Sequence, residues 1–93
     1  RVSISQGAHL CAGTHNYDQP DMPLRRTPIE IADDVWIAAD AFVGPGVVVG
    51  DGAILGARGV ACGDLDAWTI YVGNPAVSIK SRERPSSSDA TGT

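Results

Sequence analysis

The sequence predicts an all-β fold, a parallel β-helix built from six-residue repeats. Three observations predict it: aliphatic side chains recur every six residues, small side chains follow them, and aromatic residues make up only 5% of the chain. A period of six matches neither an α-helix, whose period is about 3.6, nor one long strand, whose period is about two. It matches a coil in which every hexapeptide contributes one short strand and one turn.

The repeat runs without interruption from Ile31, and an earlier pair, Ile4 and Leu10, keeps the same step. Within a hexapeptide, residues two apart such as Val35 and Ile37 point to the same side, as in a strand. Three strands per turn give a triangular prism with 18 residues per coil. A small β-sandwich with accidental spacing is the competing fold, and six consecutive matches argue against it. The in-frame positions are Ile31, Ile37, Val43, Val49, Leu55 and Ala61, and those 18 apart are predicted to stack.

The frame breaks between Leu10 and Ile31. The intervening residues 16–28 contain three prolines and several charged side chains. Because proline cannot donate to a β-ladder, this segment is predicted to be an excursion loop thrown out of the prism. A long loop on a compact fold is usually functional.

The repeat ends after Asp64. Residues 68–72 are predicted to form a last strand, and residues 73–76 a turn. We expect a short C-terminal helix over residues 77–84. The polar residues 85–93 are predicted to be a disordered tail, so the domain covers residues 1–84.

Length and composition limit the kind of protein. A chain of 93 residues holds one small domain, which excludes a two-domain enzyme. The net charge of −4 argues against a nucleic-acid surface, and no apolar run reaches the ~18–20 residues of a membrane span. Two cysteines, Cys11 and Cys62, do not make a disulfide framework, so we expect them to be reduced thiols. Reduced thiols are typical of a cytoplasmic protein. Because Arg1 falls inside the repeat pattern, we expect a C-terminal portion of a longer domain.

The two histidines, His9 and His15, are six residues apart and take the same outward position of their hexapeptides. His15 directly precedes the proline loop, so it is the candidate general base. An imidazole titrates near pH 6.5, and such a base contributes about 10²–10⁴-fold in rate. A metal site at His9 and His15 is the competing interpretation, but catalytic zinc usually takes three protein ligands. A trimer sharing ligands would allow zinc, and the sequence favours it less.

Three segments together resemble the left-handed β-helix acyltransferases with hexapeptide repeats. The string Ala12-Gly13-Thr14-His15 is similar to their catalytic histidine motif, and residues 36–47 and 68–76 carry the rest of the resemblance. The branch it resembles most comprises the colanic-acid and exopolysaccharide O-acetyltransferases, near the galactoside and maltose acetyltransferases. The resemblance covers about residues 2–84.

The resemblance implies a homotrimer that transfers acetyl from acetyl-CoA to a hydroxyl of a sugar or exopolysaccharide intermediate, without a metal. His15 would deprotonate the hydroxyl, which attacks the thioester directly. In this family CoA lies in a groove between two prisms, against small turn residues. The outward Trp36 is expected to be buried against a neighbouring prism. The resemblance places Ala39, Ala57, Cys62 and Gly63 along the groove, with Lys80 near the nucleotide end.

One departure and two alternatives stand beside this expectation. Relatives often carry a phosphate-contacting lysine where this chain has Cys62-Gly63, and Arg58, Lys80 or Arg82 is expected to take its place. The first alternative is a zinc protein similar to γ-carbonic anhydrases on the same prism. The second is a truncated, catalytically inactive prism. The identity of the acceptor lies beyond the sequence.

Overall fold

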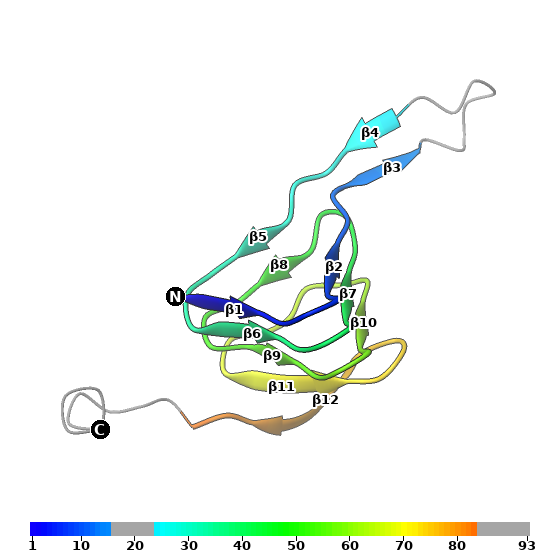
Figure 1. The fold of residues 1–93 in the computed structure, drawn as a ribbon. Helices are drawn as coiled ribbons and strands as arrows, with labels where there is room; N and C mark the ends of the chain where they lie inside the picture. Colours follow the sequence, from blue (N-terminus) through cyan, green and yellow to red (C-terminus); the bar gives the residue numbers. More distant parts are fainter. Residues whose placement is uncertain (16–23, 84–93) are drawn as a thin grey trace.

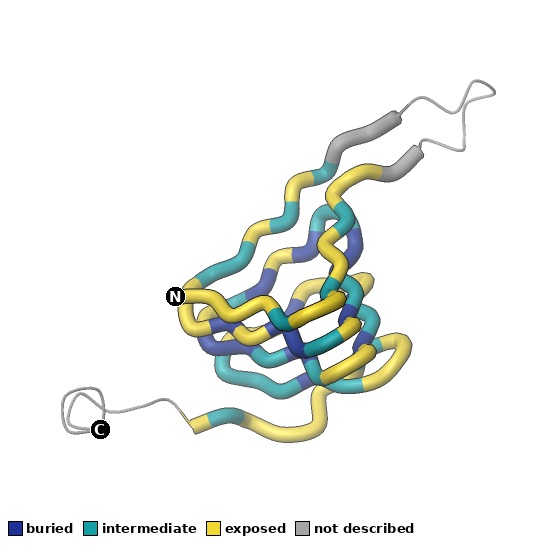
Figure 2. Tube along the Cα trace, viewed as in Figure 1, coloured by how far each residue is buried: buried dark blue, intermediate teal, exposed yellow. Residues whose placement is uncertain are grey.

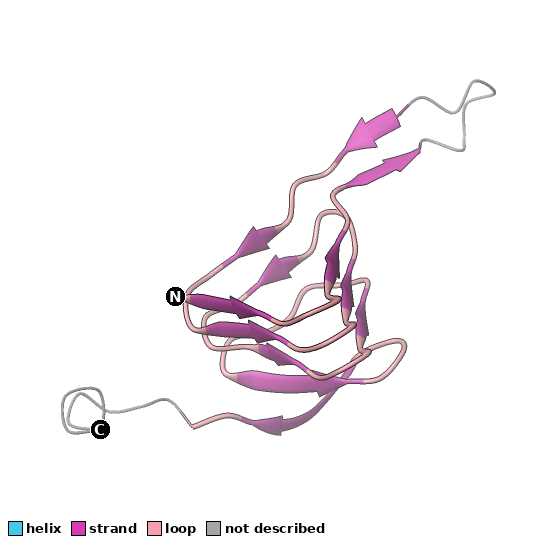
Figure 3. Ribbon diagram, viewed as in Figure 1, coloured by secondary structure: helices cyan, strands magenta, loops and turns pink. Residues whose placement is uncertain are grey.

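The computed structural model describes residues 1–15 and 24–83, which form strands and turns and no helix (Figure 3). The chain runs through three sheets one after another, and these sheets form the three faces of a triangular prism (Figure 1). Since the described residues form no helix, none of them belongs to a helix long and apolar enough to cross a membrane. The predicted all-β class is confirmed for this part of the chain.

The first face of the prism is a five-stranded sheet. Its order is β1-β6-β9-β11-β12, and neighbouring strands are parallel except for the last pair. The strands are β1 (Val2–Ile4), β6 (Val35–Ile37), β9 (Ile54–Leu55), β11 (Thr69–Val72) and β12 (Val77–Ser81).

The other two faces are narrower and entirely parallel. The second face contains β2 (His9–Leu10), β7 (Phe42–Val43) and β10 (Val60–Ala61), with β7 in the middle. The third face pairs β5 (Glu30–Ile31) with β8 (Val48–Val49). Each coil therefore crosses the three faces in the same order.

The register of these strands confirms the predicted coil of 18 residues. The inward side chains of successive coils lie directly over one another, and the buried positions follow the stacked coils (Figure 2). Each fully buried aliphatic side chain contributes about 1.5–3 kcal/mol, which is how a core poor in rings is stabilised. The observed pairs are Ile31 with Val49, Ile37 with Leu55, and Val43 with Ala61.

The last coil is shorter than the one above it. Val49 bridges to Leu65, which is 16 residues further along the chain instead of 18. The Asp64 carboxylate accepts a hydrogen bond from the Val48 N–H at 2.8 Å, and the Leu65 N–H donates to the Val48 carbonyl at 3.0 Å. The Asp64 side chain thus accepts the hydrogen bond of the Val48 N–H, which a backbone carbonyl would accept in a coil of 18 residues.

The excursion leaves the prism as a hairpin. Strands β3 (Gly13–His15) and β4 (Leu24–Arg26) are antiparallel, and they project away from the coils (Figure 1). At the base, the Thr27 N–H donates to the Ala12 carbonyl at 2.7 Å. The excursion therefore starts a few residues before the predicted range of 16–28, of which residues 16–23 lie outside the described residues.

The predicted C-terminal helix over residues 77–84 is wrong. Residues Val77–Ser81 form β12, which pairs with β11 through Val72 with Val77 and Ile70 with Lys80. Val77 and Ile79 are β-branched and alternate with polar residues, which favours a strand. The free edge of β11 offers this segment hydrogen-bond partners, whereas a helix this short gains little alone. The predicted tail, residues 85–93, lies outside the described residues.

Candidate functional site

The first corner of the prism, where the first face turns into the second, carries a line of small side chains. Ala39 and Ala57 occupy successive turns at this corner. The Arg58 N–H donates to the Ala39 carbonyl at 2.9 Å, and the Asp40 N–H donates to the Gln6 carbonyl at 3.1 Å. These bonds stack the turns directly on one another. The structure therefore brings Ala39 and Ala57 together in one column.

Cys62 and Gly63 lie at the second corner, beyond the other end of β10, and both are exposed. Neither the backbone angle nor the packing around Gly63 requires a glycine there. A Cβ added there would meet no atom within 4 Å, and its φ is outside the left-handed region. At Gly50, by contrast, an added Cβ would come within 2.7 Å of the Ala67 nitrogen. A glycine that neither backbone nor packing requires leaves room for a ligand to approach the main chain.

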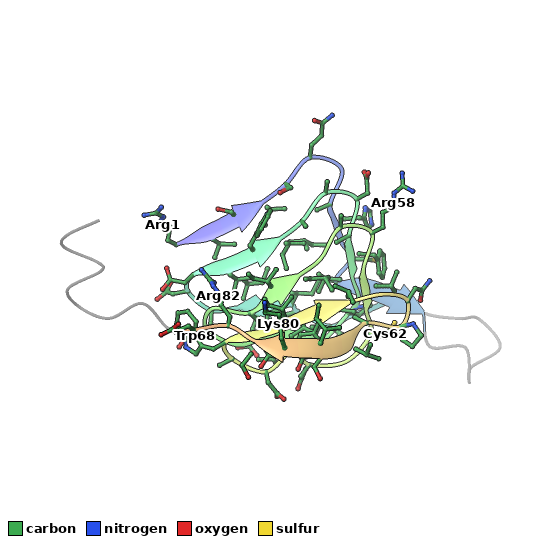
Figure 4. All side chains as sticks on the ribbon, turned by 90° about the horizontal axis from the view of Figure 1, so that it is seen from below. Arg1, Arg58, Cys62, Trp68, Lys80 and Arg82 are labelled. Atoms are coloured by element: carbon green, nitrogen blue, oxygen red, sulfur yellow. The ribbon has the colours of Figure 1, made fainter. Side chains whose placement is uncertain are left out.

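Lys80 lies on the outer side of the first face. It pairs with Ile70, which pairs with Ile54 and, through it, with the outward Trp36. Its side chain is exposed. The five residues predicted to contact CoA thus occupy three places on one prism: the first corner, the second corner and the first face, with Cys62 and Lys80 well separated (Figure 4).

His15 ends β3, at the point where the chain has left the prism for the hairpin. Its backbone pairs with Leu24 on the returning strand. The base of the hairpin is held by the Thr27 to Ala12 hydrogen bond and by the Cys11 thiol, which donates to the Gly13 carbonyl at 3.3 Å. The candidate base therefore sits on a strand that is anchored to the coil.

His9 lies on the outer side of the second face and is exposed, as predicted. Its ring stacks on Phe42, with the centroids 5.5 Å apart and the planes 7° from parallel. In residues 1–15 and 24–83, no three His, Cys, Asp or Glu residues are grouped so that they would hold a metal ion.

Arg82 has a role that the sequence did not indicate. Its Nη1 donates to the Asp34 carbonyl at 2.9 Å and to the Gly52 carbonyl at 3.0 Å. Its guanidinium also lies 5.3 Å from the centroid of the Trp68 ring (Figure 4). These partners are far apart in the sequence, so no motif reveals them. Arg82 therefore joins successive coils, and its guanidinium is already bound to other parts of the prism.

Trp36 faces outward, as predicted, and 48% of its surface is exposed. Its indole N–H donates to the Ser5 hydroxyl at 2.9 Å, which fixes the ring across the outer side of β1 and β6. Ile54 and Ile70 continue the same outward line, and both are half-buried. The first face therefore presents an apolar strip.

Comparisons with known proteins by sequence and by structure find similar proteins of one kind, the hexapeptide-repeat transferases. Residues 28–60 match the family described as bacterial transferase hexapeptide (six repeats). WcaF of Escherichia coli K12, which is named as a colanic acid biosynthesis acetyltransferase, is 43% identical over 79 residues. That match covers 85% of this chain and 43% of WcaF. The chain therefore spans less than half the length of this curated relative.

Two solved structures extend the likeness. A hexapeptide-repeat acetyltransferase of Vibrio cholerae has a TM-score of 0.82 and 27% identity, over 89% of this chain and 49% of that one. AntD, an N-acyltransferase from Bacillus cereus in complex with dTDP and 3-hydroxybutyryl-CoA, has a TM-score of 0.79 and 29% identity, over 89% and 50% of the two chains. The likeness to hexapeptide-repeat transferases implies that the coil is left-handed.

Proposed function

We propose that this chain is a member of the hexapeptide-repeat family of bacterial transferases, which residues 28–60 match, and that it takes part in transferring acetyl from acetyl-CoA to a saccharide hydroxyl. The observation that carries the proposal is the 43% identity with WcaF, which extends over 85% of this chain. The CoA thioester bound to AntD supports the class of donor. The name of WcaF supports an exopolysaccharide intermediate as acceptor.

The donor would lie along turn residues that lack long side chains. Ala39 and Ala57 form one continuous line at the first corner, and Gly63 leaves the second corner open. An extended thioester arm needs such access, because it binds chiefly to backbone amides and carbonyls. Cys62 borders Gly63 on the same exposed turn.

The acetyl-CoA site would be completed by a second copy of the chain in a homotrimer. One prism distributes the five proposed CoA contacts over two corners and one face, so a groove between two prisms would unite them. The apolar strip on the first face supports such packing, because Trp36 is 48% exposed there. Lys80, on the same face, would then lie near the nucleotide end.

His15 would act as general base. Its imidazole accepts the proton of the acceptor hydroxyl as the oxygen attacks the thioester carbonyl carbon. The tetrahedral intermediate then collapses, the C–S bond breaks, and the proton passes from His15 to the departing CoA thiolate. The products are the acetyl ester and CoA, and no acyl-enzyme forms.

Transfer to an amine is the second candidate, because AntD is an N-acyltransferase. The same base and the same donor would serve both reactions. An acceptor panel that contains sugars and amino sugars separates them.

The test measures the release of CoA thiol from acetyl-CoA by chelator-treated protein with that panel. We expect release that depends on a sugar hydroxyl and falls about 10²–10⁴-fold in His15→Gln. His9→Gln is the matched control, since it replaces the other imidazole of the chain, which stacks on Phe42, and it should keep the wild-type rate.

Three results would overturn parts of the proposal. An undiminished rate in His15→Gln removes His15 as the base. Acceptance of amino sugars alone replaces the hydroxyl by an amine. Tightly held stoichiometric zinc, with no transfer after its removal, favours the zinc protein.

A further inference from the structure

Arg58 holds a backbone conformation that is unfavourable for a long side chain. Its φ is 59°, in the left-handed region. Gly7 occupies the corresponding turn position two coils away with a φ of 77°. The turn requires this angle whatever residue is present, and glycine adopts it without the strain of a Cβ. The sequence therefore carries a guanidinium where the backbone alone favours glycine.

The guanidinium of Arg58 has no partner among the residues that the structure describes. Within residues 1–15 and 24–83, its side chain forms no ion pair and no hydrogen bond. Asp40 is the acid in the neighbouring turn of the same column, but its carboxylate lies over Gly7, where an added Cβ would come within 2.0 Å of Oδ1. Arg82, by contrast, is bound to two carbonyls.

Arg58 also stands beside the column of small residues. It follows Ala57 directly, and its own N–H binds the Ala39 carbonyl. Its side chain projects outward at the first corner, away from the Trp68 and Arg82 pair (Figure 4). An extended ligand lying along the column of Ala39 and Ala57 would meet the Arg58 guanidinium at the turn that contains Ala57.

We infer that Arg58 binds a phosphate of the nucleotide portion of CoA. The inference rests on the proposed function, which supplies the donor. CoA carries its phosphates on the same chain as the thioester arm, and the planar guanidinium fork matches phosphate oxygens in a bidentate manner. The chain as a whole is acidic, with 7 Lys and Arg against 11 Asp and Glu. A guanidinium with no partner among the described residues is therefore a local positive charge that attracts an anion to this corner.

The test is calorimetric titration of wild type and Arg58→Gly with CoA, dephospho-CoA and pantetheine. Arg58→Gly removes the charge and relaxes φ, so its melting temperature should equal or exceed that of wild type. Losing a charge-assisted phosphate contact should raise the Kd for CoA about 10–100-fold. Pantetheine, which has no phosphate, should bind both proteins equally.

Dephospho-CoA identifies which phosphate Arg58 binds. If the variant weakens CoA but not dephospho-CoA, Arg58 contacts the 3′-phosphate; if it weakens both, Arg58 contacts the diphosphate. Arg1→Gln is the matched control, because it removes the same charge at the third corner, where the Arg1 side chain is 93% exposed.

Two results would overturn the inference and leave the proposed function standing. One is equal CoA affinity in wild type and Arg58→Gly. The other is an equal loss in Arg1→Gln, which would mean that overall charge alone attracts CoA. If wild type itself binds no CoA, the proposed function fails, and the role of Arg58 fails with it.

Discussion

At the scale of single residues, Arg82 shows how contacts between coils stabilise a repeat protein. Its Nη1 binds the carbonyls of Asp34 and Gly52, and its guanidinium lies over Trp68. We expect Arg82→Met to lower the free energy of unfolding by about 2–3 kcal/mol, since two charge-assisted bonds and a cation–π contact are lost. Urea unfolding measures this.

Lys80→Met is the control for Arg82→Met. Lys80 is exposed on β12, and its removal should change the free energy of unfolding by less than about 0.5 kcal/mol. Equal effects of the two substitutions would show that Arg82 does not join the coils.

Gly63 and Gly52 form a contrasting pair. At Gly63 an added side chain meets nothing within 4 Å, so Gly63→Leu should keep the wild-type melting temperature and weaken CoA binding at least tenfold. At Gly52 the φ is 68° and a Cβ would lie 2.2 Å from the Trp68 ring, so Gly52→Ala should be clearly destabilised. Differential scanning calorimetry and CoA titration measure the two effects. Unaltered CoA affinity in a folded Gly63→Leu removes Gly63 from the site.

At the scale of elements, the strands that belong to the six-residue repeat were predicted from the sequence, whereas β12 and the shortened last coil, which lie outside the repeat, were missed. Ile37 and Leu55 pair as expected, because a fixed period and an inward-facing position determine which residues stack. The strand β12 was missed because its partner, β11, supplies the edge that makes a strand preferable to a helix. The two-residue shortening before Leu65 was missed because the Asp64 carboxylate replaces a backbone acceptor there.

The role of β12 can be tested by hydrogen exchange. Strand β11 lies between β9 and β12, so its N–H groups point in turn to one neighbour and the other. A chain ending at Ala76 should exchange those amides of Thr69–Val72 that point toward β12 much faster than a chain ending at Glu83, which retains β12 and Arg82. Exchange at wild-type rates in the shorter chain would contradict the pairing. Arg82→Met separates the loss of the strand from the loss of that side chain.

The candidate site was predictable in part. Ala39 and Ala57 were named as CoA contacts through the family resemblance, and the structure places both in one column at the first corner. Where Cys62 and Lys80 lie relative to that column became clear only in the structure, because the resemblance gave a set of groove residues and not the corner or face that each occupies. The sequence named Arg58 only as one of three cations, and the structure adds that its guanidinium has no partner in residues 1–15 and 24–83.

At the scale of the whole molecule, we expect a trimer. Sedimentation equilibrium should give three times the chain mass of 9.6 kDa. Trp36→Asp places a charge in the apolar strip of the first face and should give monomers. Val48→Asp, on the outer side of the third face at a residue 41% exposed, should remain trimeric. A wild-type monomer at tens of micromolar protein would contradict the shared groove.

The most direct test of the central claim is calorimetric titration of this chain with CoA and acetyl-CoA, because it needs no knowledge of the acceptor. We expect saturable binding of both ligands with a Kd between roughly 1 μM and 1 mM. We also expect a rise in melting temperature as CoA is added, since a ligand that binds only the folded state stabilises it. Absence of binding heat and of any melting shift at several millimolar CoA would contradict the claim.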